Sequence, residues 1–146
     1  MSRPTSNGST TSTHESERFR RGWESLIEVD PEGGPQIIES LQDVAPDLAR
    51  YAVEFAFGDI FSRPVLDPRQ RQLITISTLT ALGGAEPQLE ANVNIGLNVG
   101  LSAREIVEAM LHCLVLTGFP RVLNAVFVAK RVFEQRSVTA LTNNAD

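Results

Sequence analysis

The stretch DPRQRQLITISTLTALG at residues 67–83 decides the expected fold class. Asp67 is a good helix N-cap, Pro68 suits the first helical position, and Gln70 stands three residues after Asp67, as in a capping box. The apolar residues that follow recur at helical spacing, and Gly83 ends the pattern. The stretch therefore predicts one well-delimited helix.

Helix signals of the same kind continue downstream. Pro87 opens a helix that Gly100 ends. Ser102 and Glu105 have the spacing of a second capping box, and Pro120 opens a last helix. These signals predict three more helices, separated by short turns.

Upstream the pattern is also helical. Residues 29–34 (VDPEGG) are expected to form a loop, a helix begins near Pro46, and residues 62–64 end that helix. No stretch of useful length alternates in the manner of a strand. We predict an all-α, single-domain bundle of about six to seven helices.

Length and composition set the domain boundaries. A chain of 146 residues and 42% hydrophobic residues is long enough for one domain with its own core. Residues 1–14 are rich in Ser, Thr, Asn and Gly, so we expect a disordered polar tail there. The helical domain is expected to span residues 15–137, followed by a C-terminal tail at residues 138–146.

Several functional classes are disfavoured by composition. The net charge of −5 argues against nucleic acid as the main partner. The chain has a single cysteine, Cys113, and only two histidines, His14 and His112, which excludes an internal disulfide, a CxxC redox pair and metal sites of the multi-histidine or cysteine-rich kind. Because we see no targeting signal and no membrane-spanning stretch, we expect a soluble, cytoplasmic protein without a membrane partner.

Two of the expected helices are apolar on more than one side. Leu73, Ile74 and Ile76 cover much of one circumference, and Leu111 and Val115 belong to another such set. Helices of this kind are usually buried, and a chain of this size has little room to bury several. The sequence therefore predicts a homo-oligomer that assembles through apolar helix faces.

Four segments, in this order, resemble the carboxymuconolactone decarboxylase family. They are EFAFGDIFSRPVLD (54–67), RQLITISTLTALG (71–83), GLNVGLSAREI (96–106), and TGFP (117–120) with Asn124-Ala125 after it. The likeness covers about residues 18–136. It implies an AhpD-like helical subunit that forms trimers or hexamers, and a cofactor-free enzyme that acts on a small carboxylated lactone.

The chain departs from the family pattern at several positions. The sister branch with a CxxC pair has cysteines where this chain has Ala85 and Gln88, so that redox activity is not expected. Many members carry a His at the position of Asn92 and a Tyr at the position of Leu116. Their replacement removes the best candidate for proton transfer and a phenol that could bind substrate.

The chemistry of such a reaction suggests several substrate-binding residues. Arg71 can bind a carboxylate bidentately, or can instead pair with Asp67 or another acid. The amides of Gln72, Gln88 and Asn92 could donate to a developing oxyanion, or could have surface or capping roles. Gln88 and Asn92 are four residues apart and share a helix face, which suggests the edge of a pocket.

Further candidates lie elsewhere in the chain. His112 could transfer a proton, or be a structural histidine of the core or an interface. Arg121 and Asn124, in the first turn of the last helix, could bind a carboxylate or line an interface. Glu54 is a possible site residue, whereas Asp59, five residues on, should not share its face in an α-helix.

Three functions remain open. The first is decarboxylation of a carboxylated butenolide, with His112 or an ordered water replacing the missing acid. The second is a repurposed reaction such as cyclisation, isomerisation or dehydration, which Asn92 favours because an amide holds an oxygen but shuttles no proton. The third is a non-catalytic oligomeric binding protein, which a hydrophobically filled cavity would support and polar groups facing a cavity would contradict.

Overall fold

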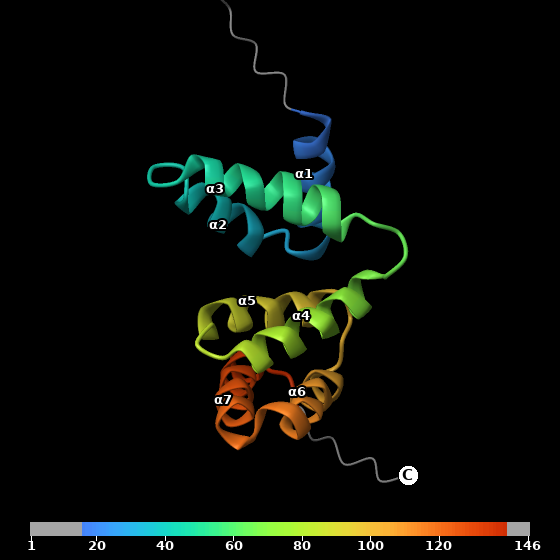
Figure 1. Cartoon of the computed structure of the whole chain (residues 1–146), viewed down its shortest axis with the longest axis vertical. Helices are drawn as coiled ribbons and strands as arrows, with labels where there is room; N and C mark the ends of the chain where they lie inside the picture. Colours follow the sequence, from blue (N-terminus) through green and yellow to red (C-terminus); the bar gives the residue numbers. More distant parts are fainter. Residues whose placement is uncertain (1–15, 140–146) are drawn as a thin grey trace, which may run out of the picture.

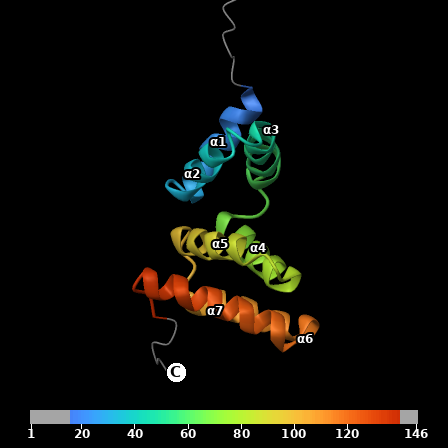
Figure 2. The same cartoon turned by 90° about the vertical axis from the view of Figure 1, so that its left-hand side faces the viewer.

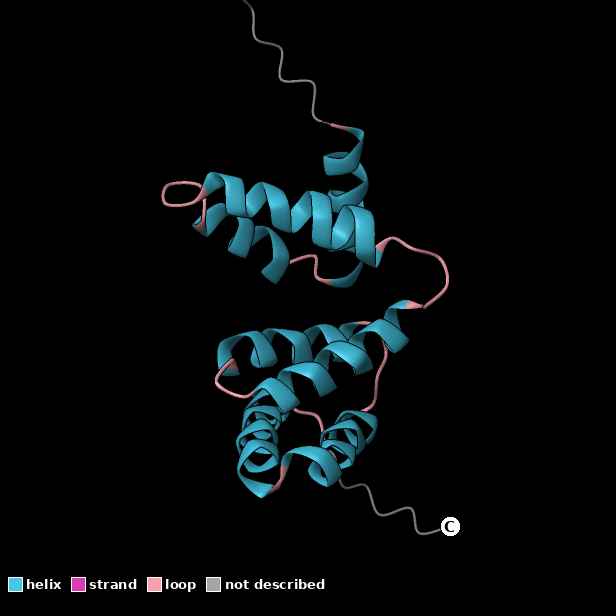
Figure 3. Cartoon of the chain, in the orientation of Figure 1, coloured by secondary structure: helices cyan, strands magenta, loops and turns pink. Residues whose placement is uncertain are grey.

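The computed structural model describes residues 16–139, and this part of the chain is helical without strands (Figure 3). The elements are α1 (Glu17–Val29), α2 (Gly33–Ser40), α3 (Pro46–Tyr51), the π-helix η1 (Ala52–Phe61), α4 (Pro68–Leu82), α5 (Glu86–Asn98), α6 (Ala103–Thr117) and α7 (Phe119–Gln135). They confirm the all-α fold class. The tails predicted at residues 1–14 and 138–146 lie outside the described residues, apart from residues 138 and 139.

The helices form two tiers (Figure 1, Figure 2). The upper tier contains α1, α2, α3 and η1, the lower tier contains α4 to α7, and residues 62–67 connect them. Each tier has its own apolar core. The upper core contains Leu26, Ile38, Ala49 and Val53, and the lower core includes Ile76, Val93, Ile106, Met110 and Val132. A hydrogen bond of 3.3 Å from Asn98 Nδ2 to Val29 O joins the two tiers.

In the upper tier, α1 crosses η1 at close range because each helix has a glycine at the contact. A Cβ atom on Gly22 would lie 2.0 Å from the carbonyl oxygen of Val53, and one on Gly58 would lie 2.7 Å from the carbonyl oxygen of Arg18. Both neighbours are backbone atoms, which cannot move aside as a flexible side chain can. The close crossing holds the arginines of α1 directly over η1.

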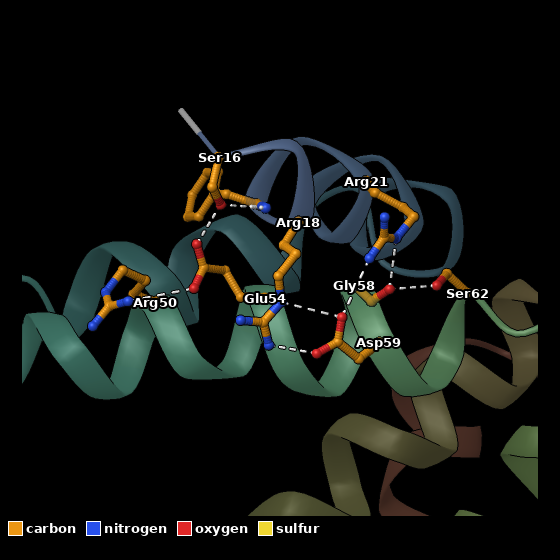
Figure 4. Close-up of polar contacts among 9 residues, drawn as sticks. Ser16, Arg18, Arg21, Arg50, Glu54, Gly58, Asp59 and Ser62 are labelled. Carbon is orange, nitrogen blue, oxygen red and sulfur yellow. Dashed lines mark hydrogen bonds and ion pairs between the residues drawn. The ribbon is translucent and has the colours of Figure 1, made fainter. Parts of the chain in front are cut away.

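The helix that begins at Pro46 changes its winding at Ala52. Residues 52–61 form a π-helix, and the i→i+5 bond from Ser62 N to Phe57 O at 3.1 Å belongs to this winding. In the wider turn, residues five apart lie closer together around the helix axis than they do in an α-helix. Glu54 and Asp59 therefore both face α1 (Figure 4), which corrects the expectation based on α-helical spacing.

Both predicted capping boxes are present. Asp67 Oδ1 accepts from Gln70 N at 2.8 Å, and Ser102 Oγ accepts from Glu105 N at 3.1 Å. Gly83 ends α4 with a φ of +65°, a conformation that favours glycine. The start and end of α4 therefore follow from local sequence signals.

The loop predicted at residues 29–34 is shorter than expected, because α2 begins at Gly33. Asp30 Oδ1 accepts from Gly33 N at 3.0 Å, which satisfies a free donor in the first turn of α2. Gly34 lies so close to Leu26 that a Cβ would be 2.5 Å from Leu26 Cδ1. The prediction was wrong at residues 33–34, where the Asp30 carboxylate accepts from Gly33 N in the first turn of α2 and Gly34 allows close packing against Leu26.

Large apolar side chains remain exposed where α6 meets α7. Val115 and Leu116 are 84% and 85% exposed, and Phe119 is 67% exposed. With Leu111, Leu123 and Phe127 they make up what we call the α6–α7 apolar surface. The apolar sides of these helices are thus not covered within one chain. Between residues 16 and 139, no helix is both long and apolar enough to cross a membrane.

Candidate functional site

A cleft of about 400 Å³ opens where α1 faces the start of α4, and we call it the α1–α4 cleft. Its polar lining comes from Arg21, Glu24 and Glu28 of α1 and from Arg63, Asp67, Arg71 and Gln72 at the opposite wall. Its apolar lining includes Phe61, Pro64, Leu66 and Pro68. The cleft combines positively charged groups with an apolar wall, as sites for small carboxylated molecules do.

Two of the acidic side chains that line the cleft already have hydrogen-bond or ion-pair partners within the chain. Asp67 caps α4, and Glu24 pairs with Arg20 at 2.6 Å. Arg63 and Arg71, in contrast, form no ion pair with the described acidic side chains. The wall at the start of α4 therefore offers positive charge to a ligand.

Arg71 has the most distinctive environment in the cleft. One terminal nitrogen donates to Arg63 O at 2.7 Å, which fixes the side chain. Its Nε is buried and has no hydrogen-bond partner among the described residues. An unsatisfied buried donor costs about 1–3 kcal/mol, so a ligand acceptor at this position would relieve a penalty. The ion pair with Asp67 that the sequence left open is not formed.

Gln72 lies beside Arg71 and is bonded to α5. Its Nε2 donates to Asn92 Oδ1 at 2.7 Å and to Asn92 O at 2.8 Å. Asn92 Nδ2 in turn donates to the backbone oxygen of Gln88 at 2.8 Å. The structure thus joins Gln72 with Asn92, but both donors of Gln72 are already used. This corrects the expectation that Gln72 donates to an oxyanion.

Glu54 belongs to a different cluster, between α1 and η1 (Figure 4). Its carboxylate, buried in the upper tier, accepts from Ser16 Oγ at 2.5 Å and from Arg50 at 3.4 Å. Glu54 is not part of the lining of the α1–α4 cleft. Its contacts join the start of α1 to α3 and η1.

Asp59 continues this cluster toward the cleft (Figure 4). It pairs with Arg18, whose Nε lies 3.2 Å from Asp59 Oδ1, and with Arg21 at 3.2 Å. Hydrogen bonding to Arg18, followed by the charges of Arg18 and Arg21, lowers the pKa of Asp59 below its ordinary value of 3.8. Arg21 also donates to Gly58 O at 2.8 Å, so the cluster fixes one wall of the cleft.

The remaining predicted site residues lie apart. His112 is exposed on α6 and lines none of the described clefts. Arg121 donates to the backbone oxygens of Ala81 and Leu82 at the end of α4. Arg121 and Asn124 line only a cavity of about 10 Å³, which is too small for a substrate. The side chain of Gln88 is exposed.

Some lining residues escaped the sequence reasoning. Arg63 stands within a segment that carries the family resemblance, so its position was a usable signal. Arg21 and Glu28 approach the cleft only because α1 folds back over η1, and no local pattern marks them.

A larger cleft of about 600 Å³ lies between α2 and α5. Its lining includes Arg136, which donates to Asn94 Oδ1 and Asn98 Oδ1 at 3.2 Å each. None of the predicted site residues lines it. We therefore take the smaller α1–α4 cleft, which contains Arg71 and Gln72, as the candidate site. In residues 16–139, no group of three or more His, Cys, Asp or Glu side chains could hold a metal ion.

Comparison with known proteins gives consistent matches. Residues 46–131, from the start of α3 to most of α7, match the model of the carboxymuconolactone decarboxylase family. A 4-carboxymuconolactone decarboxylase from Acinetobacter baylyi is 31% identical over 91% of this chain and 99% of its own length. A nitrosuccinic acid decarboxylase from Metarhizium robertsii is 34% identical over 53% of this chain and 54% of its own length.

Proposed function

Because this chain belongs to the carboxymuconolactone decarboxylase family, we propose that it is a cytoplasmic, cofactor-free enzyme whose α1–α4 cleft binds a small carboxylated lactone or a related metabolite. The observation that carries the proposal is the buried, unpartnered Nε of Arg71 in the lining of that cleft. The names of two relatives as decarboxylases support a carbon–carbon bond cleavage as the reaction.

The reaction requires one group that stabilises the negative charge developing on the lactone, and an apolar surface beside the departing carboxylate. When the carboxylate leaves, the carbon–carbon bond breaks, carbon dioxide departs and the electron pair moves through the conjugated double bond onto the carbonyl oxygen of the lactone. Arg71 and Arg63 stabilise the negative charge, because a preorganised donor at a developing oxyanion contributes about 10²–10³ in rate. The departing carboxylate faces the apolar wall of Phe61 and Leu66, where its charge is poorly solvated.

A proton must then reach the carbon. Neither Gln72 nor Asn92 titrates, so their hydrogen-bonded pair transfers no proton. In this proposal solvent water that enters the open cleft supplies it. The second candidate is a repurposed cyclisation, isomerisation or dehydration, in which the amides hold substrate oxygens in place and the protons that move are exchanged with solvent water.

A binding protein without catalysis has less support. Its expected sign was a cavity filled by hydrophobic side chains, whereas Arg63, Arg71 and Gln72 line the α1–α4 cleft.

The chain acts as a homo-oligomer, a trimer or a hexamer, through the α6–α7 apolar surface. A single protein rarely leaves side chains such as Val115 and Leu116 more than four-fifths exposed side by side without a partner. No nucleic-acid or membrane partner forms part of the proposal.

The test is direct turnover. Purified protein is incubated with 4-carboxymuconolactone, and the decarboxylated enol-lactone is followed by mass spectrometry against a control without enzyme. We expect turnover by the wild type and a loss of at least about tenfold in Arg71→Gln. A folded protein that produces no enol-lactone would contradict decarboxylation and direct the search to the repurposed reactions.

A further inference from the structure

The cleft of about 600 Å³ between α2 and α5, which we call the α2–α5 cleft, shares no lining residue with the α1–α4 cleft. Its charged lining consists of one basic side chain, Arg136 at the end of α7, and two acidic side chains, Asp30 and Glu32 before α2. None of the three forms an ion pair with a described residue of opposite charge. The cleft therefore presents charges of both signs that the described chain does not neutralise.

The guanidinium group of Arg136 is held in place by two neutral amides of α5. Asn98 Oδ1 accepts from both Nη1 and Nη2 at 3.2 Å, so it lies between the two terminal nitrogens, and Asn94 Oδ1 accepts from Nη1 at 3.2 Å. Neutral oxygens orient the group without cancelling its charge. The remaining edge, formed by Nε–H and the second N–H of Nη2, donates to none of the described residues. These parallel donors match the two oxygens of a carboxylate.

Asn98 also connects the basic side of the cleft to the acidic side. Its Oδ1 accepts from Arg136, and its Nδ2 donates at 3.3 Å to the backbone oxygen of Val29, the residue just before Asp30. Asp30 is only 9% exposed, and its Oδ1 accepts from Gly33 N at 3.0 Å, which fixes the carboxylate. Hydrogen bonds within the chain thus position a cation and an anion of the cleft before a ligand binds, which reduces the ordering cost of binding.

The signs of these charges determine the class of ligand. A molecule with only negative groups would be attracted by Arg136 but repelled by Asp30 and Glu32. An amine without a carboxylate would leave the free donors of Arg136 unused. A molecule that carries both a carboxylate and an ammonium group complements both sides of the cleft.

We propose that the α2–α5 cleft binds a small amino carboxylate of the free amino acid type. The carboxylate of the ligand lies on the free edge of Arg136, and its ammonium group faces Asp30 and Glu32. Because α2 belongs to the upper tier and α5 to the lower tier, a bound ligand joins the two tiers (Figure 1). The inference does not depend on the reaction proposed for the α1–α4 cleft, since the two clefts have no lining residue in common.

The experiment compares ligands that differ in charge but little in shape. Glycine, 4-aminobutanoate and 6-aminohexanoate hold an ammonium group and a carboxylate at three separations. Each is compared with the monocarboxylate and the dicarboxylate of the same chain, which are acetate and malonate, butanoate and glutarate, and hexanoate and pimelate. All are titrated against the full-length protein near pH 7 by isothermal titration calorimetry and ligand-observed NMR. We expect at least one amino carboxylate to bind at least about tenfold more tightly than both of its counterparts.

Variants of Arg136 test the carboxylate contact. Arg136→Gln removes the charge and should weaken binding of the best amino carboxylate at least about tenfold, and Arg136→Lys should recover only part of the affinity, because an ammonium group lacks the paired donors. Arg104→Gln, at an exposed position outside both clefts, should bind as the wild type does. Arg71→Gln, which changes only the lining of the α1–α4 cleft, should also keep the affinity. Circular dichroism checks that each variant is folded.

Variants of the acidic side test the ammonium contact. Asp30→Asn keeps an acceptor for Gly33 N, so the double variant with Glu32→Gln should fold while it loses both negative charges. In this double variant, the preference for the amino carboxylate over its dicarboxylate should fall to about onefold. Asp43→Asn, at an exposed position outside both clefts, should keep the preference of the wild type.

Two results with the wild type would overturn the proposal. One is no binding of any amino carboxylate, and the other is binding of the dicarboxylates as tight as that of their amino counterparts. Full affinity in folded Arg136→Gln, or an equal loss in Arg71→Gln, would overturn the assignment to the α2–α5 cleft. Turnover of 4-carboxymuconolactone is measured separately, so the failure of this inference and the failure of the proposed function are distinguishable.

Discussion

Gln72 Nε2 lies 2.7 Å from Asn92 Oδ1, and this contact ties α4 to α5 at a residue, Gln72, that lines the α1–α4 cleft. The family often has a histidine where this chain has Asn92, so an amide pair stands where an imidazole could transfer protons. An amide pair does not change its charge with pH. Its contribution is to hold groups in place, and acid–base chemistry must come from solvent or from another residue.

The amide pair should contribute measurably to stability. Gln72→Met removes both donated hydrogen bonds and leaves Asn92 Oδ1 without its donor, so we expect the free energy of unfolding to fall by about 1–3 kcal/mol. Urea unfolding monitored by circular dichroism measures the change. The control Gln135→Met, at an exposed position, should stay within about 0.5 kcal/mol of the wild type. Equal losses in both variants would contradict a structural role for the pair.

Arg71 should dominate carboxylate binding. Arg71→Gln keeps a polar side chain but removes the charge, so we expect the dissociation constant for 4-carboxymuconolactone to rise at least about tenfold. Arg71→Lys should recover only part of the affinity, because an ammonium lacks the Nε–H at that position. Arg104→Gln removes an exposed arginine outside the clefts and should leave binding unchanged. Similar effects of the Arg71 and Arg104 variants would point to general electrostatic attraction instead.

A variant of His112 tests whether the catalytic site is formed by one subunit alone or also needs a residue of a partner subunit. Its imidazole is exposed on α6 and does not line the cleft, so we expect His112→Gln to keep turnover within about twofold of the wild type. The measurement is kcat and KM with whichever substrate the enzyme turns over. A loss of about 10² or more would mean that a partner subunit brings its His112 to the cleft.

Asp59 should make the stability of the folded chain depend on pH in the acidic range. Its pKa is lowered in the folded chain, mainly by Arg18, so its ionised form stabilises the fold above the ordinary pKa of 3.8, and this contribution is lost as the pH falls through the lowered value. Asp59→Asn should therefore lower the urea midpoint near pH 7, and its difference from the wild type should shrink at about pH 3. Asp43→Asn, at an exposed position between α2 and α3, is the matched control and should change little at either pH. A deficit of Asp59→Asn that does not depend on pH would contradict the ion-pair explanation.

The α6–α7 apolar surface should form the interface between subunits of the homo-oligomer. Sedimentation velocity of the wild type should show a trimer or a hexamer, and Val115→Glu should shift the protein to smaller species, because a charge placed in an apolar contact is costly. Glu108→Gln changes an exposed residue of the same helix and should leave the oligomer intact. A monomeric wild type would refute the proposed assembly, and an unchanged oligomer in Val115→Glu would place the interface elsewhere.

Local signals in the sequence determined the helices and many of their ends. The capping boxes at Asp67 and Ser102 and the stop at Gly83 act over three to four residues, so their physics is complete within a short stretch. The family resemblance likewise rests on contiguous segments. The π-helix η1 and the start of α2 at Gly33 were missed: η1 packs closely on α1 through Gly22 and Gly58, and Asp30 accepts from Gly33 N at the start of α2.

The contacts and burial of the site residues could be learned only from the tertiary structure. Arg71 was found as a carboxylate ligand from its residue type, but only the fold shows that its Nε is buried without a partner and that α1 supplies the facing wall. The sequence identified Gln72 and Asn92 as amides, yet it could not show which end of each amide is free. For Gln72 that choice depends on the carbonyl of Asn92, 20 residues away along the chain, which reaches Gln72 only when α4 and α5 pack together, whereas Asn92 bonds the carbonyl of Gln88 within α5 itself.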